Sequence, residues 1–267
     1  MLGAIFGDIV GSVYEFNNTH DYNFRLLSDW SQFTDDTVMT LAVAKALMES
    51  YGKSDKKVRE TLINCMKQLG KRYPDAGYGG MFYNWVLGDN REPYNSYGNG
   101  SAMRVSAAGW MYDSLEETLH AAKLSAEVTH NHPEGIKGAQ ATAAAIYMAR
   151  TGKSKEEIRD YIENNFGYDL HKSMKDIVSR GHGEEICQVS VPQALVCFLL
   201  SDSYIDTVRK SVCIGGDSDT IACIAGSIAE AYYGMDEKYK EETMKRLPKD
   251  LQEIVNAFEG YRKNRIE

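Results

Sequence analysis

Hydrophobic residues recur along this chain mainly at the three- and four-residue spacing of amphipathic helices. In the stretch 36–51, for example, Met39, Ala42, Val43 and Ala46 fall on one helical face. The alternation of apolar and polar residues that marks a half-buried strand is scarce. The pattern therefore predicts a mainly helical protein.

Helix boundary signals support this prediction. Capping-box sequences, in which a serine precedes a glutamate by three positions, begin at Ser114 and Ser154. Gly152 follows an alanine-rich segment and suits the end of a helix. Further helices are expected at 134–150, 219–233 and 235–264, and the apolar run 194–200 is interpreted as a buried helix although its periodicity also fits a strand. No linker or repeat interrupts residues 1–267, so we expect a single all-α domain.

Composition narrows the classes of function. The formal net charge of -8 argues against a general nucleic-acid binder, which needs clustered Lys and Arg. The five cysteines form no C-x-x-C pair, which is typical of a reducing compartment. Asp8 and Glu15 come too early for a signal peptide, and no apolar run approaches the roughly 20 residues of a membrane span. We expect a soluble, cytoplasmic protein, and a monomer because no exposed apolar heptad stands out.

Two acidic clusters each precede an apolar helix. They are 34-TDDT-37 and 216-GDSDT-220. Carboxylates at a helix start can simply complement the helix dipole or cap its amides. However, hard divalent cations prefer this combination of carboxylate and hydroxyl oxygens, and several buried carboxylates repel one another unless a cation neutralises them. The pair of clusters favours a metal site over capping.

Glycine-rich segments suggest close packing and anion binding. Gly3, Gly7 and Gly11 recur every four residues, and Glu15 continues the row, so that a second backbone could approach one helical ridge. The loops 76-AGYGGMF-82 and 96-SYGNGSAMR-104 each lead into an expected helix and could cradle a phosphate, although many such loops are plain turns. The histidines of 129-THNHPEG-135 could be ligands or solvated side chains.

The ordered set of motifs resembles one known family. GDIVGSVYE, FTDDT, GYGG, SYGNGSAMRV, the Thr129-His130 step and GGDSDTIACIAGSIAEAYYG span residues 7–234. Together they are similar to the ADP-ribosylglycohydrolases, which include dinitrogenase reductase-activating glycohydrolases and ADP-ribosyl-acceptor hydrolases. The motifs lie nearest to the serine-directed branch of that family.

The resemblance implies a compact, orthogonal all-α domain with a central cleft that holds two magnesium or manganese ions. It places Glu15 as an acidic catalytic residue beside the scissile bond, acting as general acid or base. It implies that the metal ligands are Thr34, Asp35, Asp36, Asp217, Asp219 and Thr220. The implied substrate-binding residues are Gly77, Tyr78, Gly79 and Gly80 in one diphosphate loop, Ser96, Tyr97, Gly98 and Asn99 in a second loop, and His130. Tyr232 and Tyr233 fall where an aromatic ring could stack on adenine.

The resemblance also implies a reaction. A metal-dependent hydrolase of this family would cleave the glycosidic bond between ADP-ribose and an acceptor and release ADP-ribose. Two alternatives remain: a non-catalytic ADP-ribose-binding or crystallin-like protein on the same fold, and a two-metal phosphohydrolase. The residues 131–134 (NHPE) depart from the serine-directed pattern, so the acceptor stays open among arginine, serine, a nucleic-acid end, poly(ADP-ribose) and O-acetyl-ADP-ribose.

Overall fold

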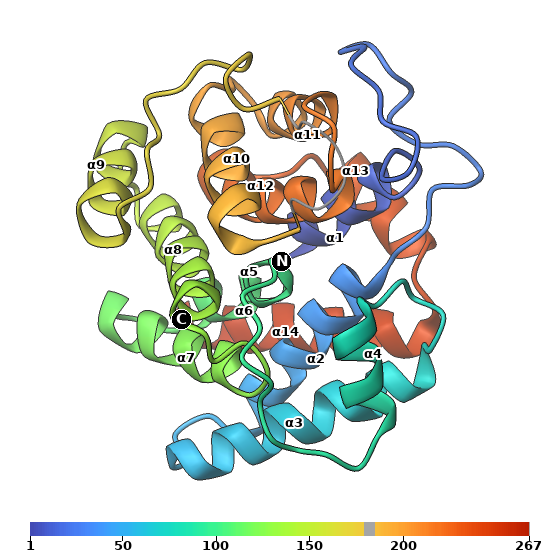
Figure 1. The fold of residues 1–267 in the computed structure, drawn as a ribbon, viewed down its shortest axis with the longest axis vertical. Coiled ribbons are helices and arrows are strands. Elements are labelled where there is room, and N and C mark those ends of the chain that lie inside the picture. The colour runs from blue at the N-terminus through green and yellow to red at the C-terminus, as the bar shows by residue number, and fades with distance from the viewer. Residues whose placement is uncertain (179–184, 267) are drawn as a thin grey trace.

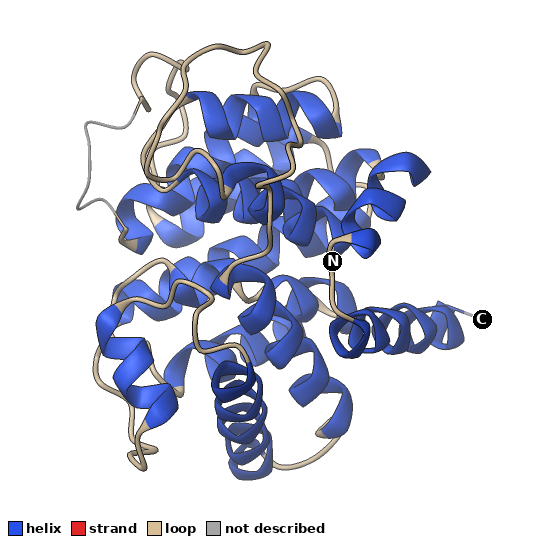
Figure 2. Ribbon diagram, turned by 90° about the vertical axis from the view of Figure 1, so that its right-hand side faces the viewer, coloured by secondary structure: helices blue, strands red, loops and turns tan. Residues whose placement is uncertain are grey.

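The chain folds into α-helices joined by loops. The computed structural model describes residues 1–178 and 185–266, and within these ranges no strand is present (Figure 2). In chain order the helices are α1 (Leu2–Gly11), α2 (Asp35–Glu49), α3 (Asp55–Arg72), α4 (Gly80–Leu87), α5 (Gly100–Met103), α6 (Ser106–Met111), α7 (Leu115–Glu127), α8 (Pro133–Arg150), α9 (Lys155–Phe166), α10 (Cys187–Leu199), α11 (Tyr204–Cys213), α12 (Ser218–Tyr233), α13 (Glu237–Lys245) and α14 (Lys249–Ile266) (Figure 1). The all-α prediction is confirmed.

Helix α12 lies at the centre of one group of helices. It packs against α1, α8, α10 and α11 (Figure 1). Its first twelve residues are all buried, which explains why small Ala, Gly and Ser residues fill it. The helices α2, α3, α7 and α14 form the other group, and the alanine-rich α8 contacts both α7 and α12.

The glycine row of α1 allows a very close approach to α12. A Cβ placed on Gly3 would lie 2.6 Å from the carbonyl oxygen of Gly226, and one on Gly11 would lie 2.5 Å from the amide nitrogen of Asp219. A Cβ on Gly7 would overlap the carbonyl oxygen of Ala222. The expected backbone contact is confirmed, but the helix ends at Gly11 and Glu15 lies in the bend that follows.

Helix boundaries follow the local signals closely. Ser154 and Glu157 form the expected capping box at the start of α9, and Ser114 accepts a hydrogen bond from the Glu117 amide at the start of α7. Gly152 takes a left-handed conformation (φ 82°) just after α8. The run at 194–200 belongs to the buried helix α10, as interpreted from its flanks. The expected segment 235–264 is divided between α13 and α14.

Among the described residues, none of the helices combines the length and the apolar character that crossing a membrane requires.

Candidate functional site

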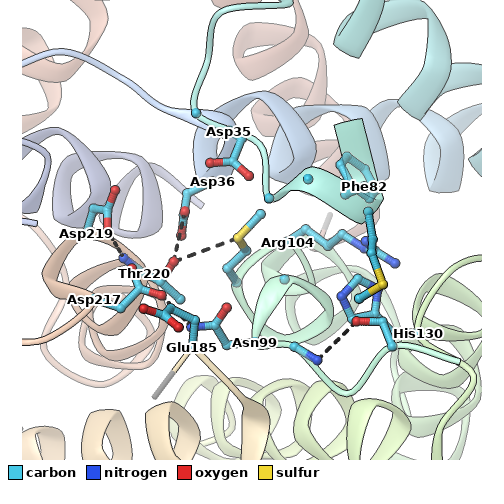
Figure 3. A pocket seen from close by; sticks show the side chains of 18 of the residues that line it. Asp35, Asp36, Phe82, Asn99, Arg104, His130, Glu185, Asp217, Asp219 and Thr220 are labelled. Atoms are coloured by element: carbon cyan, nitrogen blue, oxygen red, sulfur yellow. Dashed lines mark hydrogen bonds between the residues drawn. The ribbon is translucent and has the colours of Figure 1, made fainter. Parts of the chain in front are cut away.

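The two acidic clusters meet where the N-terminal ends of α2 and α12 come together. The Thr220 hydroxyl donates a hydrogen bond to Asp36 Oδ2 at 3.0 Å, which joins segments 184 positions apart (Figure 3). Asp217 occupies the N-cap position of α12 yet makes no capping hydrogen bond with its side chain. The capping interpretation therefore fails for Asp217, which leaves its carboxylate available for another role.

Asp8 of α1 stabilises this junction by hydrogen bonds to the start of α2. Its buried carboxylate accepts hydrogen bonds from the amide and hydroxyl of Thr34, at 3.0 and 2.7 Å, and from the amide (3.1 Å) and hydroxyl of Thr37. Thr34 caps α2, and its side chain accepts from the Asp36 amide. These contacts fix the backbone at the start of α2 and so the orientation of the Asp35 and Asp36 side chains.

Burial and mutual repulsion perturb the carboxylates strongly. Burial, followed by the charges of neighbouring carboxylates, holds the pKa values of Asp35, Asp36 and Asp219 well above their usual range. Burial is also the largest reason why the pKa of Glu15 is raised to about 7, and the Asp217 charge is the next. Groups perturbed in this way favour neutralisation by a proton or by a cation.

The donor set fits a divalent cation. Asp36 Oδ1 is buried and has no hydrogen-bond partner among the described residues. Carboxylate oxygens of Glu15, Asp217 and Asp219 can lie within 4.8 Å of one another. An orphaned buried oxygen facing a cluster of oxygen ligands is the chemistry that Mg²⁺ or Mn²⁺ prefers. Glu15 thus lies at this cluster, with a carboxylate oxygen close enough to share an ion with Asp217 and Asp219.

A cavity of about 540 Å³ opens from the carboxylates toward the glycine loops. The residues predicted for the site that line it are Glu15, Asp35, Asp36, Gly77, Gly79, Gly80, Ser96, Gly98, Asn99, His130, Asp217, Asp219 and Thr220. Its carboxylates occupy one side, while Arg104, Phe82 and His130 occupy the other (Figure 3). Thr34, Tyr78 and Tyr97 are not among the lining residues.

The two tyrosines are turned elsewhere. The Tyr78 ring packs against Phe82 with ring centroids 5.6 Å apart. The Tyr97 side chain is 47% exposed, and its ring lies 5.2 Å from that of His132. Their loops reach the cavity through backbone atoms, so sequence position alone was a poor guide to these side chains.

The first glycine loop has the form of an anion cradle. The Asp35 amide donates to the carbonyl oxygen of Ala76, which fixes this loop beside the carboxylates. Gly77 has φ 103°, and the space around a Cβ placed on Gly79 or Gly80 is open to 4 Å. Gly80 begins α4, whose first amides have no partner within the helix. Amides and open space at a helix start suit a phosphate group.

The second glycine loop is already partly occupied by internal bonds. The Gly98 amide donates to the Ser96 hydroxyl, and the Asn99 amide donates to the carbonyl oxygen of Glu185. The Asn99 side chain donates to Asp217 Oδ2 at 2.6 Å and to the Ser190 hydroxyl. This loop therefore positions the Asp217 carboxylate and offers fewer amides to a ligand than its sequence suggested.

Several lining residues had not been identified as site residues. Phe82, Tyr94, Met103, Arg104 and Glu185 belong to this group. Arg104 closes the motif SYGNGSAMR, and that position was the available signal for it. Glu185 lies outside every motif, so nothing local in the sequence indicated its place.

The structure gives no support to the adenine-stacking expectation for Tyr232 and Tyr233, because neither residue lines the cavity. Both residues end α12, about 20 Å from its acidic start at 1.5 Å per residue. Their rings pack on Phe198, and the Tyr233 hydroxyl donates to the carbonyl oxygen of Ser201. They belong to the packing of α10 against α12.

Known proteins match this chain along nearly its whole length. The human ADP-ribosylhydrolase ARH3 is 30% identical, with 97% of this chain and 88% of the relative covered. ADP-ribosyl-[dinitrogen reductase] glycohydrolase of Rhodospirillum rubrum is 26% identical, over 88% of this chain and 85% of the relative. A solved "ADP-ribosylglycohydrolase-related protein complex" shares the fold, with a TM-score of 0.64 and 22% identity over 96% of this chain and 95% of that one.

The family described as ADP-ribosylglycohydrolase matches residues 1–266. This match covers the acidic junction, both glycine loops and the helices that carry them. The chain belongs to the ADP-ribosylglycohydrolase family and is an ADP-ribosyl glycohydrolase.

Proposed function

We propose that this protein uses two divalent cations to hydrolyse the glycosidic bond between ADP-ribose and an acceptor, releasing ADP-ribose. The observation that carries the proposal is the junction of α2 and α12, where buried carboxylates with raised pKa values and the orphaned Asp36 Oδ1 face one end of an open cavity. Relatives named as ADP-ribosyl hydrolases supply the substrate class.

The residues that would hold the cations are Asp35, Asp36, Asp217, Asp219 and Thr220, as predicted from the sequence. Thr34, the sixth predicted ligand, caps α2 and lies outside the cavity lining, so its part in the site would be to position Asp36. When bound, magnesium or manganese ions would neutralise these carboxylates, orient a water and the ribose hydroxyls, and stabilise charge in an oxocarbenium-like transition state. Asn99 holds Asp217, and Asp8 holds the start of α2, so the ligands are positioned before a cation arrives.

Glu15 is the proposed proton carrier. In the cation-free protein its pKa is raised to about 7, first by burial and then by the Asp217 charge, so Glu15 can hold or release a proton near neutral pH. A carboxyl group tuned in this way can accept a proton from the attacking water and can donate one to the leaving acceptor atom. Its place in the bend after α1, where it is only partly buried, would let it reach the bond between ribose and acceptor.

The rest of the cavity binds the ADP-ribosyl group. The open amides at the start of α4 receive the diphosphate, while His130 and Arg104 line the far wall. Energy from these remote contacts positions the reacting carbon. An acidic protein can bind this anion because local cations and amide dipoles, rather than net charge, set the field in the cavity.

The test is an assay of ADP-ribose release from peptides ADP-ribosylated on serine or on arginine, with magnesium and with EDTA. Asp36→Asn and Asp219→Asn should each lower release at least ~100-fold, because each removes one charge from the cluster. Asp89→Asn, an exposed aspartate at the far end of α4, is the control and should retain full activity. Near-normal activity in both site variants would contradict the proposal.

The other candidate functions predict different products. ADP-ribose binding without turnover on any peptide of the panel would identify a binding protein. Release of AMP in place of ADP-ribose would identify a phosphohydrolase. The same panel reports which acceptor is cleaved fastest.

A further inference from the structure

A buried cation stands on the side of the cavity opposite the carboxylates. Arg104 is only 1% exposed, and its guanidinium lies beside the His130 ring (Figure 3). Burial lowers the pKa of this guanidinium to about 10, so it remains charged at neutral pH. With so little of its surface exposed, Arg104 acts mainly on the protein groups that it contacts.

A chain of hydrogen bonds leads from Arg104 to His130. Arg104 Nη2 donates to the carbonyl oxygen of Ser125 at 2.7 Å and to the hydroxyl oxygen of Thr129 at 2.8 Å. Thr129 Oγ1 lies 2.7 Å from His130 Nδ1. A guanidinium only donates, so the Thr129 oxygen accepts from it. Among the described residues His130 Nδ1 is the other hydrogen-bond partner of Thr129 Oγ1, and we assign the hydroxyl proton of Thr129 to this bond.

This direction of donation decides the tautomer of the ring. If Nδ1 accepts the Thr129 proton, the neutral imidazole carries its own proton on Nε2. Double protonation is opposed by burial and then by the Arg104 charge, which hold the pKa of His130 well below its usual range. Tyr94, the other titratable group beside the ring, stays a neutral phenol because burial raises its pKa to about 12.

The protonated Nε2 faces the part of the cavity bounded by the second glycine loop. A Cβ placed on Gly100 would lie 3.2 Å from Nε2, and one on Gly98 would lie 3.6 Å away. Glycine at both positions therefore leaves the donor uncovered. His130 itself lines the cavity.

We infer that Arg104 and Thr129 are positioning residues that lock His130 in its Nε2–H tautomer, so that the cavity wall presents one fixed hydrogen-bond donor to an acceptor atom of the ligand. The inference that the ligand is ADP-ribose rests on the proposed function, whereas the tautomer is a property of the free protein. The two can therefore fail separately.

The tautomer is tested on the free protein by nitrogen-15 NMR of labelled histidine side chains at neutral pH. The signals of His130 are identified by their loss in His130→Gln. We expect an unprotonated Nδ1 and a protonated Nε2. Thr129→Val should give mixed tautomers, and Thr129→Ser should restore the single one. An Nδ1–H tautomer or a doubly protonated ring in the unmodified protein would overturn the inference, whatever the protein binds.

The consequence for binding is tested by calorimetric titration with ADP-ribose. Thr129→Val should weaken binding roughly tenfold, and Thr129→Ser should recover it. A second pair of variants acts on the ring alone. The amide of His130→Gln can place a donor where Nε2–H stands, whereas the shorter side chain of His130→Asn cannot. We expect the glutamine variant to bind at least fivefold more tightly than the asparagine variant. Equal affinities in both pairs would refute the role in binding, and absence of binding to the unmodified protein would refute the ADP-ribose assignment alone.

Discussion

Asp8 is the residue on which the start of α2 depends. Its carboxylate accepts from both the amides and the hydroxyls of Thr34 and Thr37. Asp8→Asn would turn an amide donor toward these donors, so we expect a loss of about 2 kcal/mol in the free energy of unfolding, measured by urea denaturation. Thr37→Val removes a single hydroxyl and should cost about half as much. An asparagine variant as stable as the unmodified protein would contradict this role.

Glu15 is close enough to the cluster to act either as proton carrier or as metal ligand. If it carries the proton, Glu15→Gln should lower kcat roughly 100-fold and leave the affinity for ADP-ribose within about threefold. Steady-state kinetics at several magnesium concentrations measures this. The exposed Glu116→Gln serves as a matched control. A much higher magnesium requirement with nearly normal kcat would assign Glu15 to the metal.

At the scale of single residues, motifs located the carboxylates better than the side chains around them. Asp36 and Asp219 face the cavity as expected because a helix start fixes the direction of its first-turn residues. Asp8 and Arg104 were not identified, since their partners lie 21 or more positions away and only the fold brings them into contact. The Tyr97 side chain lies outside the cavity lining although its loop lines the cavity, because a loop residue can point its side chain either way.

At the scale of elements, the contact between α1 and α12 depends on glycine. Gly7→Ala would place a methyl group on the carbonyl oxygen of Ala222 and separate the two helices. We expect a loss of about 3 kcal/mol in the free energy of unfolding, with reduced activity because α12 carries Asp219.

The control for this change is another helical glycine. Gly260 lies within α14, and nothing stands within 4 Å of a Cβ placed there. Gly260→Ala should stabilise the protein by about 0.5–1 kcal/mol through helix propensity. Thermal and urea unfolding of both variants measures the contrast. Equal effects of the two changes would contradict the packing argument.

The positions of the helices in the sequence were more predictable than their arrangement in space. Periodicity and capping placed α2, α8 and α12 within two residues of their observed ends, because both signals are local. The position of Tyr232 shows the limit. A residue near a motif in sequence can be several helical turns away from it in space, and periodicity carries no information about which end of a helix faces the cavity.

At the scale of the whole molecule, the acidic junction should make stability depend on pH. The pKa values of Asp8 and Glu15 rise from ordinary values of 3.8 and 4.5 to about 6 and about 7, and those of Asp35, Asp36 and Asp219 also rise. Folding thus takes up protons. The stabilisation of the folded state that comes from this proton uptake is complete below pH ~4. It is lost as the pH rises through 6 and 7.

In EDTA we therefore expect the Tm to be roughly 5 °C lower at pH 8 than at pH 5.5. Magnesium should raise the Tm more at pH 8, where the carboxylates are ionised, than at pH 5.5. Differential scanning calorimetry measures both effects. In Asp36→Asn the dependence on pH should be weaker. A Tm that is independent of pH and of magnesium would contradict a cation site at the junction.

The contacts of α1 and α2 with α12 have a consequence for how the protein folds during its synthesis. Asp36 and Thr220 are 184 positions apart, so at a synthesis rate of ~5–20 residues per second their segments leave the ribosome roughly 10–40 s apart. Until α12 has been synthesised the glycine face of α1 lacks this partner, and the entropy of closing so long a loop slows the contact afterwards. The cavity must be among the last features to form. A chain whose synthesis stops before α12 should therefore have no hydrolase activity.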